Sequence, residues 1–130
     1  MKITTQAQLL LDQKRYPLEA DLTSKVKDWL DLQRDISYWK ASDRYTKGVS
    51  DIILCVGGWF VGAELKADDG VPSPQQSLFI REMLKVNGIA GVCYTLGEVK
   101  ALVEEARQRT VLYNEVRQRA GSFPANTGED

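Results

Sequence analysis

The chain of 130 residues contains no histidine. This absence excludes imidazole general bases, Ser-His-Asp triads and zinc sites built with histidine. Any chemistry must therefore use carboxylates, lysine or a hard metal ion. No apolar run is long enough to cross a membrane, and the N-terminal residues lack the features of a signal peptide, so we expect a cytoplasmic protein.

The chain also has few cysteines and a small net charge. Cys55 and Cys93 lie in apolar, strand-like runs, which favours buried free thiols over a disulfide. The formal net charge is only -1, so a surface for a polyanion would need local segregation of charge. The length and the 43% content of hydrophobic residues indicate one domain, expected over residues 1–120 with a flexible polar tail at 121–130.

Hydrophobic spacing predicts the main elements. A helix is expected from Pro17 to about Gln33. Two strands are expected at 50–56 and 59–65, joined by the tight turn Gly57-Gly58. The mixed segment 36–47 favours an irregular or weakly extended connection, although a short strand is also compatible with it.

The second half of the chain contains two helix starts. Ser73, Pro74 and Gln76 form a predicted capping box that opens a helix ending near Asn87. A third strand is expected at 89–96. A second box, at Thr95 and Glu98, opens a long helix that we expect to reach Arg119, with or without a break near Thr110.

The tight turn also predicts a pair of opposed acids. Counting outward from Gly57-Gly58 puts Asp51 opposite Glu64, and like charges in that position destabilise a sheet. Strand alternation sends Lys66 to the face of Glu64. Mg²⁺ prefers two carboxylates together with waters and a substrate phosphate, so the three residues fit phosphodiester hydrolysis. The alternative is a solvated ion-pair network with no chemical role.

The same residues resemble a nuclease family. Gly48-Val49-Ser50-Asp51, Glu64-Leu65-Lys66, Gly70 and Ser73-Pro74-Gln75-Gln76 resemble the VRR-NUC (virus-type replication-repair nuclease) family of the PD-(D/E)XK superfamily, in its stand-alone phage or bacterial type. The resemblance runs from about Glu19 to Val103. It implies an α/β fold with a restriction-endonuclease-like core, in which helices flank a mixed β-sheet. It also implies a Mg²⁺- or Mn²⁺-dependent DNA endonuclease.

The resemblance assigns roles at the centre of the site. Asp51 and Glu64 correspond to the metal-binding acids, Leu65 would offer its backbone carbonyl to the metal, and Lys66 would position the attacking water. Gln76 matches a glutamine near the family's active site, but a cap for the helix explains it equally well. Glu19 matches an acid that reaches the metal directly or through water, or else it is a first-turn acid favoured by the helix dipole.

A DNA-facing surface is expected just before the first strand of the hairpin. Aromatic residues alternate there with Lys40, Arg44 and Lys47, which could contact phosphates, and Ser73 is counted with them. The alternative, which we favour for Trp39, is that the aromatic residues belong to the core. The arginines of the last helix alternate with glutamates, which favours a solvated face over a subunit contact.

The resemblance also suggests a substrate and an assembly. The family includes enzymes that act on branched DNA as homodimers, so we expect a homodimer that resolves Holliday junctions in DNA repair. One alternative is a non-catalytic DNA-binding or assembly module on a nuclease fold. Another is a nuclease of different specificity, such as a flap-cutting or nicking enzyme.

Overall fold

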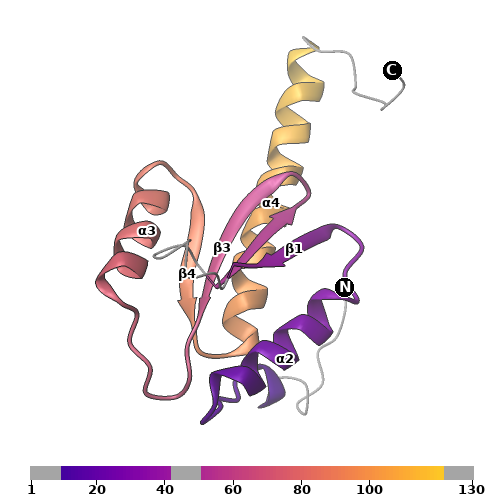
Figure 1. Ribbon diagram of the computed structural model, residues 1–130. Helices are drawn as coiled ribbons and strands as arrows, with labels where there is room; N and C mark the ends of the chain where they lie inside the picture. Colours follow the sequence, from indigo (N-terminus) through magenta and orange to yellow (C-terminus); the bar gives the residue numbers. More distant parts are fainter. Residues whose placement is uncertain (1–9, 42–50, 122–130) are drawn as a thin grey trace.

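The computed structural model describes residues 10–41 and 51–121. Its elements follow the order α2 (Glu19–Leu30), β1 (Ile36–Lys40), β2 (Ile52–Val56), β3 (Trp59–Leu65), α3 (Pro74–Lys85), β4 (Ile89–Cys93) and α4 (Leu96–Ala120). The protein has an α/β fold in which a four-stranded mixed sheet packs against helices (Figure 1). This coarse expectation from the sequence is confirmed.

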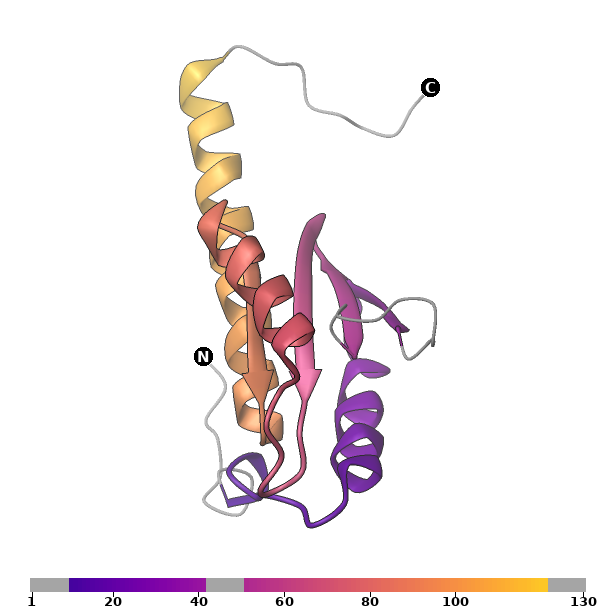
Figure 2. The same cartoon turned by 60° about the vertical axis from the view of Figure 1, so that its left-hand side comes forward.

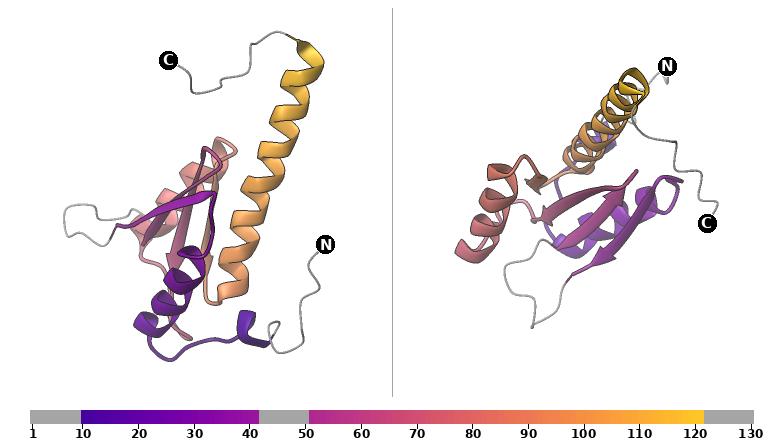
Figure 3. Two further views of the ribbon diagram at one scale, coloured as in Figure 1. Left: turned by 90° about the vertical axis from the view of Figure 1, so that its right-hand side faces the viewer. Right: turned by 90° about the horizontal axis from the view of Figure 1, so that it is seen from above.

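The sheet has the strand order β1-β2-β3-β4. The pairs β1–β2 and β2–β3 are antiparallel, whereas β3 and β4 are parallel and are connected through α3. Helix α4 contacts β2, β3 and β4 as well as α2. The last turns of α4 extend beyond the sheet, while α3 lies beside the edge strand β4 (Figures 2 and 3).

The β2–β3 hairpin has the predicted two-residue loop. Val56 pairs with Trp59 and Ile52 pairs with Ala63, which is the register expected from the sequence. Gly57 and Gly58 have φ angles of 55° and 93°, which fit the type I′ turn that matches the twist of the strands. The predicted register is therefore confirmed.

Strand alternation divides the sheet into a core face and a non-core face. On the core face, Leu54 and Val61 pack with Leu22 and Val26 of α2 and with Val103 of α4. The non-core face is formed by the alternate residues of β1 to β3 and by the residue preceding β2: Ser37, Trp39, Asp51, Ile53, Cys55, Phe60, Gly62 and Glu64. The hairpin therefore directs its two acids away from the hydrophobic core.

The irregular connection expected in segment 36–47 is wrong for residues 36–40, where the alternative of a short strand is confirmed. Ile36 and Tyr38 pack against the core cluster, while Ser37 and Trp39 point to the non-core face. The core assignment of Trp39 is also wrong, because its side chain is 62% exposed. Aromatic residues on both faces obscured the alternation in the sequence.

Other expectations needed smaller corrections. Helix α2 begins at Glu19 and ends at Leu30, inside the predicted limits, and α4 passes Thr110 without a break. Cys93 is buried and burial raises the pKa of its thiol to about 12, but Cys55 is exposed because it lies on the non-core face. In residues 10–41 and 51–121, no helix is both long enough and apolar enough to cross a membrane.

Candidate active site

Asp51 and Glu64 lie opposite each other at the open end of the β2–β3 hairpin. The backbone N–H of Asp51 donates to Oε2 of Glu64 at 3.0 Å. In return, the N–H of Leu65 donates to Oδ2 of Asp51 at 3.2 Å. The two side chains thus extend the strand ladder beyond its last backbone pair, and the predicted juxtaposition of the two acids is confirmed.

Glu64 is fully buried although it belongs to the non-core face. Its Oε1 accepts no hydrogen bond. The ammonium Nζ of Lys66 lies 3.3 Å from this oxygen, in ion-pair contact but without hydrogen-bond geometry, and the Lys66 side chain is 16% exposed. A buried carboxylate oxygen without a hydrogen-bond donor is costly, so this atom lacks the partner that its position requires.

The electrostatics follow from this burial. Desolvation, and after it the charge of Asp51, raise the pKa of Glu64 to about 7, although Lys66 partly opposes both effects. Glu19, at the start of α2, has a raised pKa because of burial and of Asp51, against the opposing charges of Lys66 and Lys40. Three carboxylates and two lysines therefore share one electrostatic environment.

A divalent cation fits this donor set. Two carboxylates, one of them with a buried oxygen that accepts no hydrogen bond, suit Mg²⁺ or Mn²⁺, which keep several waters. Within the described residues, however, no group of three or more His, Cys, Asp or Glu side chains could hold a metal ion. Glu19 is thus not brought into direct coordination with Asp51 and Glu64. Binding of the ion by Glu19 through water stays a prediction, and so does its binding by the backbone carbonyl of Leu65.

Ser73 and Gln76 are engaged in starting α3. The N–H of Ser73 donates to Oε1 of Gln76 at 2.7 Å, and the N–H of Gln76 donates to Oγ of Ser73 at 3.2 Å. The capping box predicted from the sequence is confirmed. Because Oε1 of Gln76 accepts this bond, the side chain is held at the start of α3, and a role for it in the active site stays a prediction.

The predicted DNA-contacting residues are only partly placed. Lys40 is exposed at the end of β1, close enough to affect the titration of Glu19. Arg44 and Lys47 lie outside the described residues, as do Gly48, Val49 and Ser50. The tail at 122–130 also lies outside them, after Gly121 ends α4 with a φ of 57°.

Two arginines of α4, Arg107 and Arg109, make defined contacts with other side chains. Arg107 donates two hydrogen bonds to Asp35, at 2.9 and 2.8 Å, and so anchors the helix to the segment before β1. Arg109 pairs with Glu105 at 3.0 Å and lies over the ring of Trp59. These ion pairs are partly exposed to solvent, which agrees with the predicted solvated face, although Arg107 also holds α4 to Asp35.

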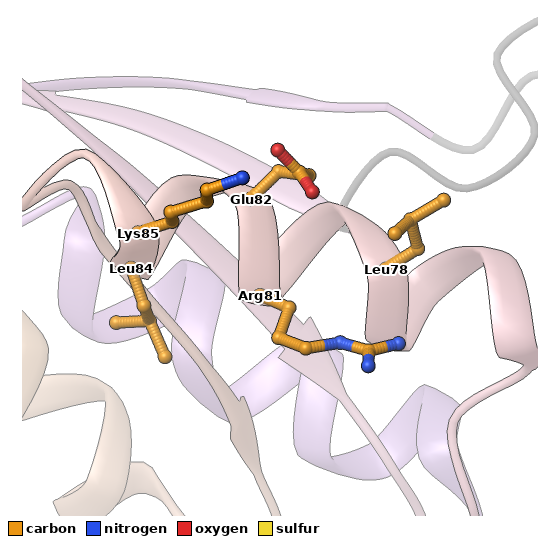
Figure 4. Close-up of a pocket in the computed structure, with 5 residues that line it drawn as sticks. All are labelled: Leu78, Arg81, Glu82, Leu84 and Lys85. Carbon is orange, nitrogen blue, oxygen red and sulfur yellow. The ribbon is translucent and has the colours of Figure 1, made fainter.

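A shallow hollow on α3 lies apart from these acids. It is lined by five residues of that helix, which are Leu78, Arg81, Glu82, Leu84 and Lys85 (Figure 4). Its single acid, Glu82, is exposed, so the hollow lacks the buried and opposed carboxylates of the hairpin. The chemistry of the described residues is concentrated at Asp51, Glu64 and Lys66.

One relevant residue was missed in the sequence. Phe60 lies on the same face as Glu64 and is 43% exposed. Strand alternation places residues i and i+4 on one face, so the spacing could have identified it.

Comparisons with protein-family models, with curated proteins and with solved structures found no match. The geometry of the site therefore carries the functional argument.

Proposed function

We propose that the protein is a Mg²⁺- or Mn²⁺-dependent DNA endonuclease that hydrolyses phosphodiester bonds. The observation that carries this proposal is the fully buried Glu64, whose Oε1 has no hydrogen-bond donor while Asp51 and Lys66 lie beside it. Two opposed carboxylates and a lysine in such a position lower the stability of the free protein. A function that uses the charges explains why they are placed there.

Each residue has a distinct role in this proposal. Asp51 and Glu64 hold the ion, assisted by the carbonyl of Leu65 and by Glu19 through water. When bound, the ion supplies positive charge that stabilises the negative charge developing on the phosphate. Lys66, already 3.3 Å from Glu64, orients the attacking water and neutralises charge on the phosphate oxygens.

A purely structural ion pair explains the arrangement less well. An ion pair that contributes to stability satisfies its buried oxygens with well-aligned donors, because desolvation otherwise exceeds the attraction. Here Lys66 contacts Oε1 of Glu64 without hydrogen-bond geometry, and the pKa of Glu64 stays raised to about 7 despite that contact. The ammonium therefore does not fully compensate the two acids, which leaves a reason for a cation.

The order of elements supports a PD-(D/E)XK-like core of the VRR-NUC type. The order α-β-β-β-α-β precedes α4, and the acids lie at the end of the central hairpin. We extend the proposal to a homodimer that acts on branched DNA such as a Holliday junction. Val111, Leu112 and Val116 are about 60% exposed on the C-terminal part of α4, whose last turns extend beyond the sheet, and they offer an apolar surface to a second copy.

The test is cleavage of a labelled four-way junction, a flap, a linear duplex and a single strand, with Mg²⁺, Mn²⁺ or EDTA. Wild type is compared with Glu64→Gln and with the control Glu82→Gln, which changes an exposed acid of α3. We expect metal-dependent cleavage by wild type and by the control only. Cleavage of a substrate other than the junction would keep the nuclease and change its specificity. Metal-independent junction binding without any cleavage would favour a non-catalytic binding module.

A further inference from the structure

The non-core face has two exposed aromatic rings next to the candidate active site. Trp39 is 62% exposed and Phe60 is 43% exposed. Trp39 pairs with Ile53, and Phe60 pairs with Cys55, so both rings belong to the same face as Asp51 and Glu64. Exposed aromatic side chains on the same sheet face as the buried Glu64 and the half-buried Asp51 need an explanation that folding does not provide.

The position of Trp39 connects it to the acids. Ala41, two residues after Trp39, donates its N–H to the carbonyl of Asp51 at 2.7 Å, which continues the β1–β2 ladder to the acid. Trp39 is therefore about 7 Å along the strands from the level of Asp51, since a strand rises about 3.3 Å per residue. A DNA strand with one phosphate at Asp51 and Glu64 would pass next to the ring of Trp39.

The chemistry of the face suits bases better than phosphates or proteins. Over β1, β2 and the first four residues of β3, its side chains are uncharged: Ser37, Trp39, Ile53, Cys55, Phe60 and Gly62. The two partly exposed rings present less than about 400 Å², because a whole aromatic side chain presents about 150–250 Å². A stable protein interface needs about 800 Å² from each partner, so a second protein bound here would have to extend well beyond these two rings.

We propose that Trp39, supported by Phe60, forms a stacking platform for unpaired nucleobases next to the scissile phosphate. This inference rests on the proposed nuclease function and names its substrate class, which is DNA with unpaired nucleotides beside the cleavage site. Bases inside a duplex already stack on each other, whereas unpaired bases can stack on protein aromatic rings. Among branched substrates, the platform thus favours one with an open strand, such as a flap, over a fully paired four-way junction.

The experiment measures binding by fluorescence anisotropy in EDTA, where no cleavage occurs. The probes are a labelled oligothymidylate and an abasic oligonucleotide of the same length, which keeps the phosphates and lacks the bases. Wild type should prefer the oligothymidylate. Trp39→Leu should weaken that binding about five- to hundredfold, without affecting the abasic probe, because each stacked base contributes roughly 1–3 kcal/mol.

Two variants separate stacking from general apolar contact. Trp39→Phe keeps an aromatic ring and should retain most of the preference, whereas Trp39→Leu keeps apolar area and should lose it. Leu32→Ala, at a 79% exposed leucine after α2, should behave as wild type. Equal binding of both probes by wild type, or equal binding of the oligothymidylate by wild type and Trp39→Leu, would overturn the platform.

Cleavage assays on the same preparations distinguish this failure from failure of the nuclease. Metal-dependent cleavage with no base-dependent binding would refute the platform and leave the enzyme. Base-dependent binding that is lost in Trp39→Leu, without cleavage under any metal, would support the platform and refute the enzyme. A change in oligomeric state caused by Trp39→Leu would show a protein contact and would also refute the platform.

Discussion

The pairs Ser73–Gln76 and Asp51–Glu64 were both predicted from the sequence, and both join a side chain to a nearby backbone N–H. In the first pair each side chain accepts a hydrogen bond from the other residue's backbone, so the start of α3 is satisfied. In the second pair, Glu64 accepts from the N–H of Asp51, and Asp51 accepts from the N–H of Leu65. Oε1 of the fully buried Glu64 is nevertheless left without a hydrogen-bond donor.

The difference separates a structural pair from a functional candidate. Backbone capping stabilises a helix and needs nothing further from outside the protein. Two neighbouring carboxylates at a buried position lower stability unless a cation compensates them. An incompletely satisfied polar group is therefore a better indicator of function in this chain than the presence of hydrogen bonds.

The largest effect is expected from Lys66→Met, which removes the ammonium beside the two acids. Cleavage should fall about 100- to 1000-fold, as it does when one stabilising donor is removed from an active site, while the fold persists. Single-turnover rates and circular dichroism measure the two effects. Lys85→Met changes an exposed lysine of α3 and serves as the control. Undiminished cleavage by Lys66→Met would remove Lys66 from the mechanism.

The next effect concerns the pH dependence of the metal-free protein. The pKa of Glu64 is raised from 4.5 to about 7, so the folded state holds its proton longer than the unfolded state. The unfolding free energy should therefore fall as the pH rises from about 4.5 to 7, by about 3 kcal/mol. Glu64→Gln should lack this decrease, and saturating Mg²⁺ should oppose it in wild type.

Urea unfolding across that pH range provides the measurement. Below pH 4.5 Glu64 is protonated in both the folded and the unfolded state of wild type. The unfolding free energies of wild type and Glu64→Gln should therefore differ least there. Parallel curves for wild type and Glu64→Gln would show that Glu64 is not destabilised by its surroundings. The contrast with the satisfied pair at α3 would then disappear.

A smaller effect is expected at the satisfied pair. Ser73→Ala should lower the unfolding free energy by about 1 kcal/mol, because an N-cap hydroxyl is lost. Gln76→Glu keeps a capping-box acceptor and should retain stability. If Gln76→Glu also retains cleavage, the residue acts in the helix cap; loss of cleavage by this stable variant would assign Gln76 to the active site.

The smallest effect is expected at the exposed pair of Asp35 and Arg107. Hydrogen bonds from Arg107 lower the pKa of Asp35, so this contribution to stability is present above the usual aspartate pKa and decreases as the pH falls. Solvent screening limits the loss in Asp35→Asn to less than about 1 kcal/mol at neutral pH. Thermal melting at neutral and acidic pH would measure it, and a loss as large as that predicted for Glu64 would contradict the distinction.

The sequence predicted what depends on local rules. The Gly57-Gly58 turn determines the hairpin register and hence the meeting of Asp51 and Glu64, and Ser73 with Gln76 marks the start of α3. Thr95 likewise caps α4, since its hydroxyl accepts from the N–H of Glu98 at 3.1 Å. The carboxylate of Glu98 accepts from the Thr95 hydroxyl at 3.3 Å and from the backbone N–H of Tyr94, rather than from the backbone N–H of Thr95 as in a full capping box. Local hydrogen bonding therefore explains most confirmed expectations.

What depends on distant contacts was not predictable. The burial of Glu64 requires neighbours that no local pattern identifies, and Trp39 is exposed because it lies on the non-core face of the sheet. The bond between Arg107 and Asp35 joins residues that are far apart in the chain. Such contacts depend on tertiary structure rather than on residue spacing.

The central claim is that Asp51 and Glu64 form a divalent-cation site. The most direct measurement is Mn²⁺ titration followed by electron paramagnetic resonance, with wild type and Glu64→Gln compared at neutral pH. The account predicts saturable binding by wild type and a large loss of affinity in the variant. Binding that is absent from wild type, or that is the same in both proteins, would contradict it.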